Sequence, residues 1–327
     1  MRLFNCPACG ARIFFANLTC AACKTPLVYR PDLNAFAAGA APCANRAEIA
    51  CNWAAETDGL CRSCAMTGVI PDTFHGENRD LWAEAELAKR RVVAGLGRWG
   101  WLGPRDGGPA PTFHLLAEDT RAGPATVVMG HAGGVVTINI TEADPVARVS
   151  RREALGERQR TMTGHFRHEI AHFLFMRLAE RPEFLPAFRA LMGDEREDYA
   201  AALARHYADG PPPGHNRCHV TAYASAHPHE DWAETAAHVM HLTDMLDSAT
   251  AAGLSGRGLP PAGYDAYAER DAKRLLTQAV RLGIAINHVN RSMGLADIYP
   301  FVLHFAVRRK IRAVHRWLSA GPAVTAP

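Results

Sequence analysis

The sequence predicts an α+β fold that is mostly helical, with a separate N-terminal module and a small β-sheet in the main part of the chain. Three observations predict it. Eight of the nine cysteines lie in the first 64 residues. Segments with apolar residues at helical spacing fill most of the rest, and two short β-branched runs interrupt them near residue 130. We therefore expect three segments, at residues 1–28, 29–75 and 76–320.

Composition and charge narrow the class of protein. The 327 residues are 48% hydrophobic and 21% charged, which is ordinary for a globular protein with a sizeable core. No apolar run approaches the roughly 18 residues that span a bilayer, and the N-terminus lacks the apolar stretch of a secretory signal. We therefore expect a cytoplasmic protein with no membrane partner. The net charge of +3 gives no support to nucleic acid as a partner, and the sequence does not define an oligomeric state.

The first cysteines form two CxxC pairs separated by ten residues. Each pair makes a tight turn that presents two thiolates to one ion, and Gly10 follows the first pair, where a left-handed residue is often needed. Without a secretory signal, cysteines at this density indicate metal rather than disulfides. A redox CxxC would need a βαβ context that is missing here. We expect a structural zinc ribbon with the ligands Cys6, Cys9, Cys20 and Cys23.

A second set of four cysteines follows in residues 29–75, and only its last two members form a CxxC. Its spacing is irregular, and the alternative is a group of unpaired buried thiols. Neither set leaves an open coordination position, so both metals are expected to be structural. Segments this small have little core, so the metal would supply their stability. The expected ligands of the second zinc are Cys43, Cys51, Cys61 and Cys64.

The remaining pattern predicts helices on both sides of a β-hairpin. Strands are expected at 127–129 and 135–140, flanking the glycine-rich turn between them, and residues 100–123 are expected to be loop. The helices are expected at 77–99, around 164–178, and near 196–207, 229–246, 264–282 and 301–318.

The sequence His168-Glu169-Ile170-Ala171-His172 is the most informative motif, because it reads HExxH. On a helix, residues i and i+4 share a face, so both imidazoles reach one metal ion, and the glutamate lies beside it, where it can hold a water. This is the arrangement of a zinc hydrolase. The alternative is a pair of satisfied core histidines with a surface glutamate, which is less common on one helical turn.

Catalytic zinc usually takes three protein ligands, and a later helix offers the third. Pro228 marks its start, and Glu230 and Glu234 lie four residues apart on one face. In gluzincin peptidases the second helix bears ExxxD, where the first acid binds zinc and the second orients a ligand histidine. We therefore expect Glu230 to bind the metal and Glu234 to orient a ligand. Three rivals for the third ligand stay open, namely His227, His229 and His238.

Nearly the whole chain resembles the bacterial zinc-binding metallopeptidase family with an N-terminal zinc ribbon. Departures from the family are Ala171, where glycine is frequent, and Phe173-Leu-Phe175 in place of a Tyr-Tyr-Trp-like stretch, and neither includes a ligand. The resemblance implies a gluzincin-like, zincin-fold metallopeptidase domain after the ribbon. Besides the ribbon cysteines, its motifs include Cys51-Asn-Trp53, Gly164-His-Phe-Arg-His-Glu169, Gly193-Asp-Glu-Arg196, Asp198-Tyr199, Ala222-Tyr-Ala-Ser225 and His227-Pro-His-Glu-Asp-Trp-Ala-Glu234.

These elements together predict hydrolysis of peptide bonds in a peptide or protein substrate, with one catalytic and two structural zinc ions. Glu169 is expected to act as general base and to pass its proton to the leaving amine. Tyr223 and His227 are candidate donors to the oxyanion, although Tyr223 is equally well interpreted as a packed aromatic. The strand at 135–140 is a candidate for binding an extended substrate by edge pairing.

A rival hypothesis belongs to another class of protein. The ribbon would be a binding module for nucleic acid or a protein partner, and the HExxH site would be secondary or would act on bound proteins, as in SprT-like proteins. The mild charge and the lack of interleaved aromatic and basic residues in the ribbon count against it.

Overall fold

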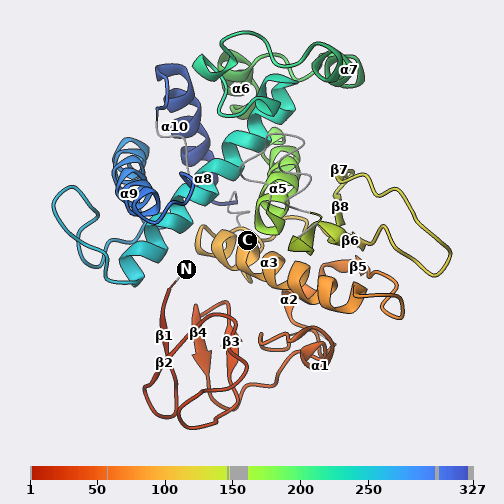
Figure 1. The fold of residues 1–327 in the computed structure, drawn as a ribbon, viewed down its shortest axis with the longest axis vertical. Helices are drawn as coiled ribbons and strands as arrows, with labels where there is room; N and C mark the ends of the chain where they lie inside the picture. Colours follow the sequence, from red (N-terminus) through yellow and green to blue (C-terminus); the bar gives the residue numbers. More distant parts are fainter. Residues whose placement is uncertain (1, 57, 146, 148–160, 299–301, 323–327) are drawn as a thin grey trace. The chain divides into compact units, whose positions relative to one another are not determined.

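The computed structural model describes residues 2–56, 58–145, 147, 161–298 and 302–322 (Figure 1). These form two compact units. The first contains the described residues up to Ile170 together with Pro322, and the second contains Ala171–Gly321. The division falls inside one continuous helix, α5 (Met162–Ala179).

The N-terminal part of the first unit consists of two small antiparallel hairpins, β1 (Phe4–Asn5) with β2 (Arg12–Ile13) and β3 (Val28–Arg30) with β4 (Ala35–Ala37). Tyr29 is at the centre of an aromatic cluster. Its ring contacts Phe4, Phe15, Phe36 and Trp53 at centroid distances of 5.1–5.7 Å. Because Trp53 belongs to the second cysteine segment, the two cysteine-rich segments share one apolar core.

The rest of the first unit is a four-stranded sheet with helices. The strand order is β5 (Thr67–Val69), β6 (Thr112–Leu116), β8 (Val135–Asn139) and β7 (Gly130–Ala132), and only β7 is antiparallel to its neighbour. Phe113 of β6 is buried against Phe166 of α5 and beneath the Lys89 ammonium of α3 (Asn78–Arg98). The first turn of α5 and the long helix α3 therefore pack on the sheet. The short helices α1 (Arg46–Ile49) and α2 (Arg62–Ala65) and the 3₁₀ turn η1 (Ile140–Ala143) complete this unit.

The sheet differs from the sequence-based expectation in three respects. Residues 100–123, expected to be loop, contain β6. The strand expected at 127–129 is instead β7, directly before a two-residue turn at Gly133 and Gly134, where both φ angles are positive (55° and 86°). The strand proposed for edge pairing, β8, is hydrogen-bonded on both sides, and the edge strands of the sheet are β5 and β7.

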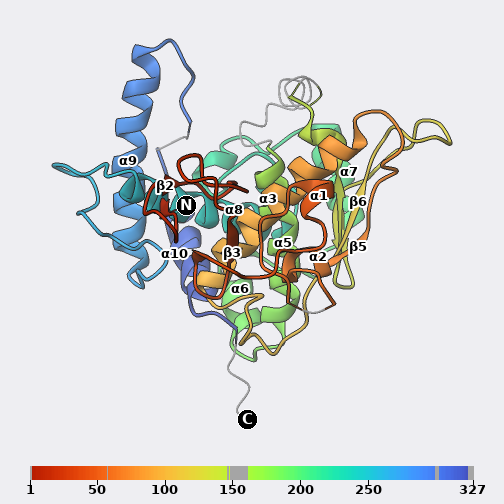
Figure 2. The ribbon, with the colours of Figure 1, turned by 90° about the horizontal axis from the view of Figure 1, so that it is seen from below.

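The second unit is helical beyond the end of α5. It comprises α6 (Phe184–Met192), α7 (Tyr199–Asp209), the 3₁₀ turns η2 (His215–Arg217) and η3 (Tyr223–Ser225), α8 (Pro228–Ala251), α9 (Ala272–Ser292) and α10 (Phe305–Ser319). Both views show α8, α9 and α10 as neighbours, and all three pack against one another (Figures 1 and 2). Within the described residues, no helix is long and apolar enough to cross a bilayer.

Two helices of the second unit depart from the sequence-based expectation. Helix α6 was not expected, because it is short and carries Pro186, which a helix accepts in its first turn. Helix α9 begins at Ala272 rather than near Tyr264. The reason is a cap: the Asp271 carboxylate accepts hydrogen bonds from the Lys273 and Arg274 amides. The last predicted helix began at residue 301, which lies outside the described residues, and α10 starts at Phe305.

Candidate metal centres

The HExxH sequence occupies the middle of α5. His168 and His172 are half-buried, one turn apart, and Glu169 is 7% exposed. The opposite side of the helix is fully buried through Ile170 and Ala171. Helix α8 is held against α5 by the Trp232 indole, whose Nε1 donates a 2.8 Å hydrogen bond to the Ala171 carbonyl. This contact brings the start of α8 close to His172.

Glu230 lies in the first turn of α8. The helix begins with His227 as its N-cap and Pro228 as its first residue, which are features that define a helix start. The Glu230 side chain is 1% exposed, and its Oε1 lies 3.5 Å from Nε2 of His172. One donor atom from each of His168, His172 and Glu230 lies within 4.8 Å of the other two.

These three residues fit a zinc ion by geometry and by donor chemistry. Zinc binds imidazole nitrogen and carboxylate oxygen at about 2.0–2.2 Å, so two ligands of a tetrahedral site are about 3.3–3.6 Å apart. The observed separation of 3.5 Å between His172 and Glu230 lies in that range. Two neutral imidazoles and one carboxylate leave one position for water or substrate.

Tyr199, the first residue of α7, is a site residue that our sequence analysis did not select. Its hydroxyl donates a 2.7 Å hydrogen bond to Oε1 of Glu230, and its ring packs edge-on against His227. The start of α7 can be recognised in the sequence from Asp198, because aspartate is a frequent N-cap residue. In the structure its carboxylate accepts a hydrogen bond from the Ala201 amide. No spacing rule connects Tyr199 with Glu230, which is 31 residues away.

The structure places the rival ligands outside the donor cluster. The Nδ1 of His227 accepts a 3.1 Å hydrogen bond from the His229 amide, so its Nε2 carries the proton and donates to the Glu197 carbonyl. The His229 ring stacks on His227, and burial, together with the charges of His172 and His227, lowers its pKa to about 4. His238 bonds through Nδ1 to the Glu234 carbonyl, one turn further along α8.

Two further predicted residues lie near the start of α8. Tyr223 sits in η3, where burial first and the Glu230 charge second raise the pKa of its hydroxyl well above the ordinary value. The hydroxyl therefore stays protonated and able to donate. Glu234 accepts a 2.7 Å hydrogen bond from the Thr221 hydroxyl through Oε2, which fixes its carboxylate.

The first four cysteines converge on one point. Their sulfurs lie within 4.8 Å of one another, and the pairs Cys6–Cys23 and Cys9–Cys20 are each 3.7 Å apart. A tetrahedron with Zn–S bonds of about 2.3 Å has edges of about 3.8 Å. Each CxxC turn ends in a left-handed residue, Gly10 (φ 74°) after the first and Lys24 (φ 61°) after the second.

The second four cysteines also converge, despite their irregular spacing. All four are buried, with sulfur separations of 3.7 Å for Cys51–Cys61 and 3.8 Å for Cys51–Cys64. Backbone amides point at the sulfurs, because Cys61 N–H donates to Cys43 and Cys64 N–H donates to Cys61. Such donors stabilise thiolates in a metal site. Among the residues that the structure describes, no cysteine forms a disulfide.

Comparisons with known proteins agree with this chemistry. A family model described as "putative zinc-binding metallo-peptidase" matches residues 78–317, and a zinc-ribbon domain model matches residues 3–41. The chain belongs to this metallopeptidase family, and it carries the zinc ribbon at its N-terminus.

Similar proteins occur in mycobacteria. The chain is 39% identical, over 331 aligned positions, to proteins of Mycobacterium bovis (uncharacterized protein Mb2598c) and Mycobacterium tuberculosis strain H37Rv (uncharacterized protein Rv2568c). The alignment covers 96% of this chain and 94% of each relative. No solved structure matches the chain.

Proposed function

We propose that the chain is a zinc-dependent peptidase of the gluzincin type, in which His168, His172 and Glu230 bind the metal and Glu169 is the general base. The observation that carries this proposal is the convergence of those three donor atoms beside a buried glutamate on the same helical turn. Membership of a zinc metallopeptidase family supports the reaction class.

Zinc held by these residues would polarise the substrate carbonyl and lower the pKa of a coordinated water to about 7. Glu169 follows His168 directly, so its side chain leaves α5 about 100° further round the helix, beside the metal ligands rather than among them. From there its carboxylate accepts a proton from the attacking water and later donates it to the leaving amine.

Two tyrosines are the best donors to the developing oxyanion. Tyr223 keeps its proton because burial raises its pKa, and the Tyr199 hydroxyl already lies 2.7 Å from a proposed ligand atom. A preorganised donor at such a position is worth about 10²–10³ in rate. His227 is less suited than either tyrosine, because its Nδ1 caps α8 and its Nε2 donates to the Glu197 carbonyl, so both ring nitrogens are engaged.

Outer residues would hold the ligands in place. Thr221 fixes the Glu234 carboxylate, which we propose orients a ligand histidine across the face of α8.

An extended substrate would pair with β7, because this strand is at an edge of the sheet, whereas β8 is hydrogen-bonded on both sides. The two four-cysteine clusters would each hold a structural zinc, giving three metal ions per chain.

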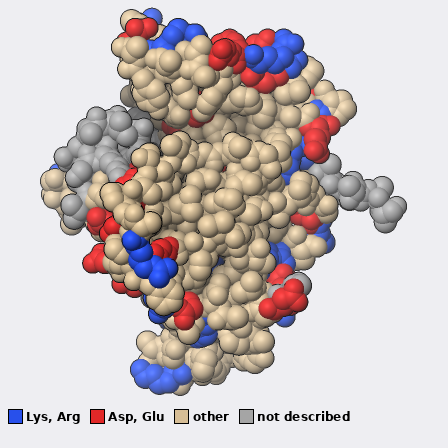
Figure 3. Space-filling model, turned by 90° about the vertical axis from the view of Figure 1, so that its right-hand side faces the viewer, with Lys and Arg blue, Asp and Glu red and all other residues tan. Residues whose placement is uncertain are grey.

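The face drawn in Figure 3 gives no support to the rival hypothesis, a ribbon that binds nucleic acid. On the face drawn in Figure 3, Lys and Arg are interspersed with Asp and Glu rather than gathered into a basic patch. Electrostatic binding to the phosphate backbone needs such a patch.

The test is hydrolysis of an unfolded protein, such as fluorescein-labelled denatured casein, by the full zinc-loaded chain. Cleavage should stop with a chelator, return on adding zinc, and be absent from the Glu169→Gln variant. Cleavage that persists in that variant would point to a contaminating protease. Salt-sensitive DNA binding with no cleavage of free or DNA-bound protein would favour the rival.

A further inference from the structure

A groove in the second unit lies outside the proposed metal site. It has a volume of about 590 Å³, within the range of binding sites for small molecules and short segments, and it runs between α6 and α10 with α8 at its base. Its residues all belong to the second unit. The proposed reaction uses none of them.

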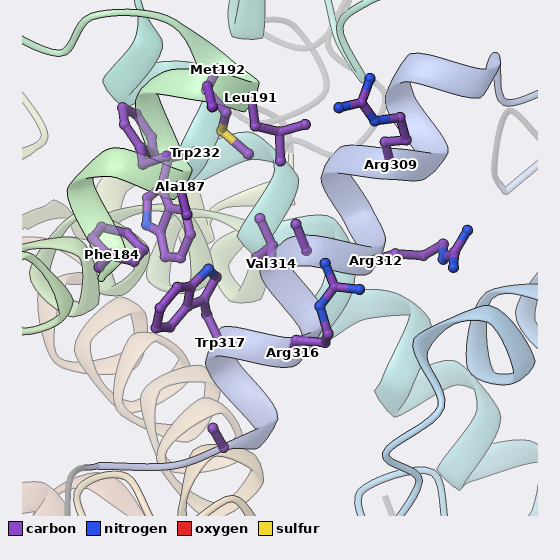
Figure 4. A pocket seen from close by; sticks show the side chains of 14 residues that line it. Phe184, Ala187, Leu191, Met192, Trp232, Arg309, Arg312, Val314, Arg316 and Trp317 are labelled. Carbon is purple, nitrogen blue, oxygen red and sulfur yellow. The ribbon is translucent and has the colours of Figure 1, made fainter. Parts of the chain in front are cut away.

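The floor of the groove is aromatic and rigid. The Phe184 ring packs edge-on against Trp232 at 5.2 Å and against Trp317 at 5.1 Å. Phe184 and Trp232 are each at most 1% exposed. Figure 4 shows these three rings gathered on one side of the groove. Ala187 on α6 and Ala313 on α10 line the groove with single methyl groups, which leaves room between the helices.

The rim of the groove is positively charged. Arg309, Arg312 and Arg316 line it from α10, at spacings of three and four residues that place them along one side of the helix (Figure 4). No Asp or Glu lines the groove, and no ion pair within the described part of the chain includes any of the three arginines. The Nε of Arg312 is buried and has no hydrogen-bond partner among the described residues.

We propose that this groove binds an acidic peptide segment with large apolar side chains, as a docking site for a protein partner or substrate. Apolar side chains would lie against the half-buried Trp317 and Leu191 above the buried rings, and carboxylates would meet the arginines. Arginine pairs with carboxylates through two parallel hydrogen bonds. The charges extend over about 10 Å of helix, which an extended segment of about four residues spans.

The position of the groove connects it with the proposed peptidase site. Trp232 in its floor is two residues after Glu230 on α8, and its indole bonds to the carbonyl that precedes His172. A protein held in the groove would therefore be tethered one helix away from the proposed metal ligands. The binding itself rests only on the groove and requires no hydrolysis.

The experiment measures binding by fluorescence polarisation, with the full zinc-loaded chain carrying Glu169→Gln so that the probe is not cleaved. The probe is a fluorescein-labelled peptide of about ten residues, alternating glutamate with phenylalanine or leucine. We expect saturable binding that weakens with salt, and at least about tenfold weaker binding when every glutamate of the peptide is replaced by glutamine.

Variants of the groove residues test whether the peptide binds in the groove. Combining Arg309→Ala with Arg316→Ala should weaken binding about tenfold or more. The matched control is Arg308→Ala, which removes an exposed arginine from the same helix outside the groove. Ala187→Trp should fill the groove and abolish binding, and thermal denaturation establishes that each variant is folded.

Three results would overturn the proposal: equal binding by the double arginine variant, equal binding of the glutamine peptide, or no saturation up to about 1 mM. Binding of dodecanoate in place of the peptide would also overturn it, because the groove would then be a fatty-acid site. Failure of casein hydrolysis with intact peptide binding would refute only the proposed peptidase function.

Discussion

The Tyr199 hydroxyl donates a 2.7 Å hydrogen bond to Oε1 of Glu230, the same carboxylate oxygen that lies 3.5 Å from Nε2 of His172. The start of α7 is thereby connected to the HExxH helix through one carboxylate of α8. We propose two uses for this hydroxyl: it orients the carboxylate, and by turning away from Glu230 it donates its one proton to a substrate oxygen.

Tyr199→Phe separates these two uses. We expect a loss of about 10–100-fold in kcat with a smaller change in zinc affinity, because a tyrosine that stabilises an oxyanion acts mainly on the transition state. The measurement is steady-state kinetics together with zinc content after dialysis. Tyr264→Phe, at a tyrosine that precedes α9 and lies outside the proposed site, is the control. Loss of zinc with unchanged turnover per bound metal would make Tyr199 purely a positioning residue.

Glu169→Gln should leave the metal in place and reduce hydrolysis by a factor of about 10²–10⁴, because glutamine cannot accept the proton of the attacking water. The matched control is Glu180→Gln, an exposed glutamate just past the end of α5, which should keep full activity. Zinc content and casein hydrolysis are measured on the same samples. If Glu169→Gln released zinc, the glutamate would be a ligand rather than a base.

Glu230→Gln should weaken zinc binding itself, because the amide oxygen is a poorer ligand than a carboxylate. We expect loss of about one zinc per chain after dialysis against a mild chelator, under conditions where Glu169→Gln retains it. Zinc held as firmly as in the parent would place the third ligand elsewhere.

The sequence was sufficient to predict a site wherever the residues of that site are close together in the chain. HExxH needs only one helical turn, and each CxxC turn needs only four residues, so the structure shows both clusters with the expected members. The irregular second cysteine set was also identifiable, because cysteines at that density are typical of a metal site.

The sequence was insufficient where geometry depends on tertiary contacts. Tyr199 could not be connected with Glu230, because only the packing of α7 against α8 brings them together. Strand β6 was hidden in a segment rich in Gly and Pro, and sheet order made β7 rather than β8 an edge strand. The groove likewise could not be predicted, because its lining residues come from α6, α8 and α10, which are far apart in the sequence.

Metal content tests the three-site prediction. The full chain should contain about three zinc ions, and His172→Ala and Cys9→Ser should each remove about one. Cys9→Ser should also loosen the N-terminal hairpin, because the small segment depends on its metal, while casein hydrolysis persists. Cys218→Ser is the control, since this exposed cysteine belongs to neither cluster. Global unfolding of His172→Ala would contradict separate structural and catalytic sites.

His315 on α10 should make the stability of the fold dependent on pH. It is fully buried, and burial is the main cause that lowers its pKa from 6.5 to about 4. Between those values the unfolded chain binds a proton that the folded chain does not, so stability is complete above about pH 6.5 and falls as the pH drops towards 4. A shift of this size corresponds to about 3 kcal/mol at most.

His315→Gln should flatten the fall in melting temperature between pH 6.5 and 4, compared with the parent and with His288→Gln at an exposed position. An identical slope in His315→Gln and the parent would show that another group is responsible, with the half-buried His219 and His229 as the next candidates because their pKa values are also lowered to about 4.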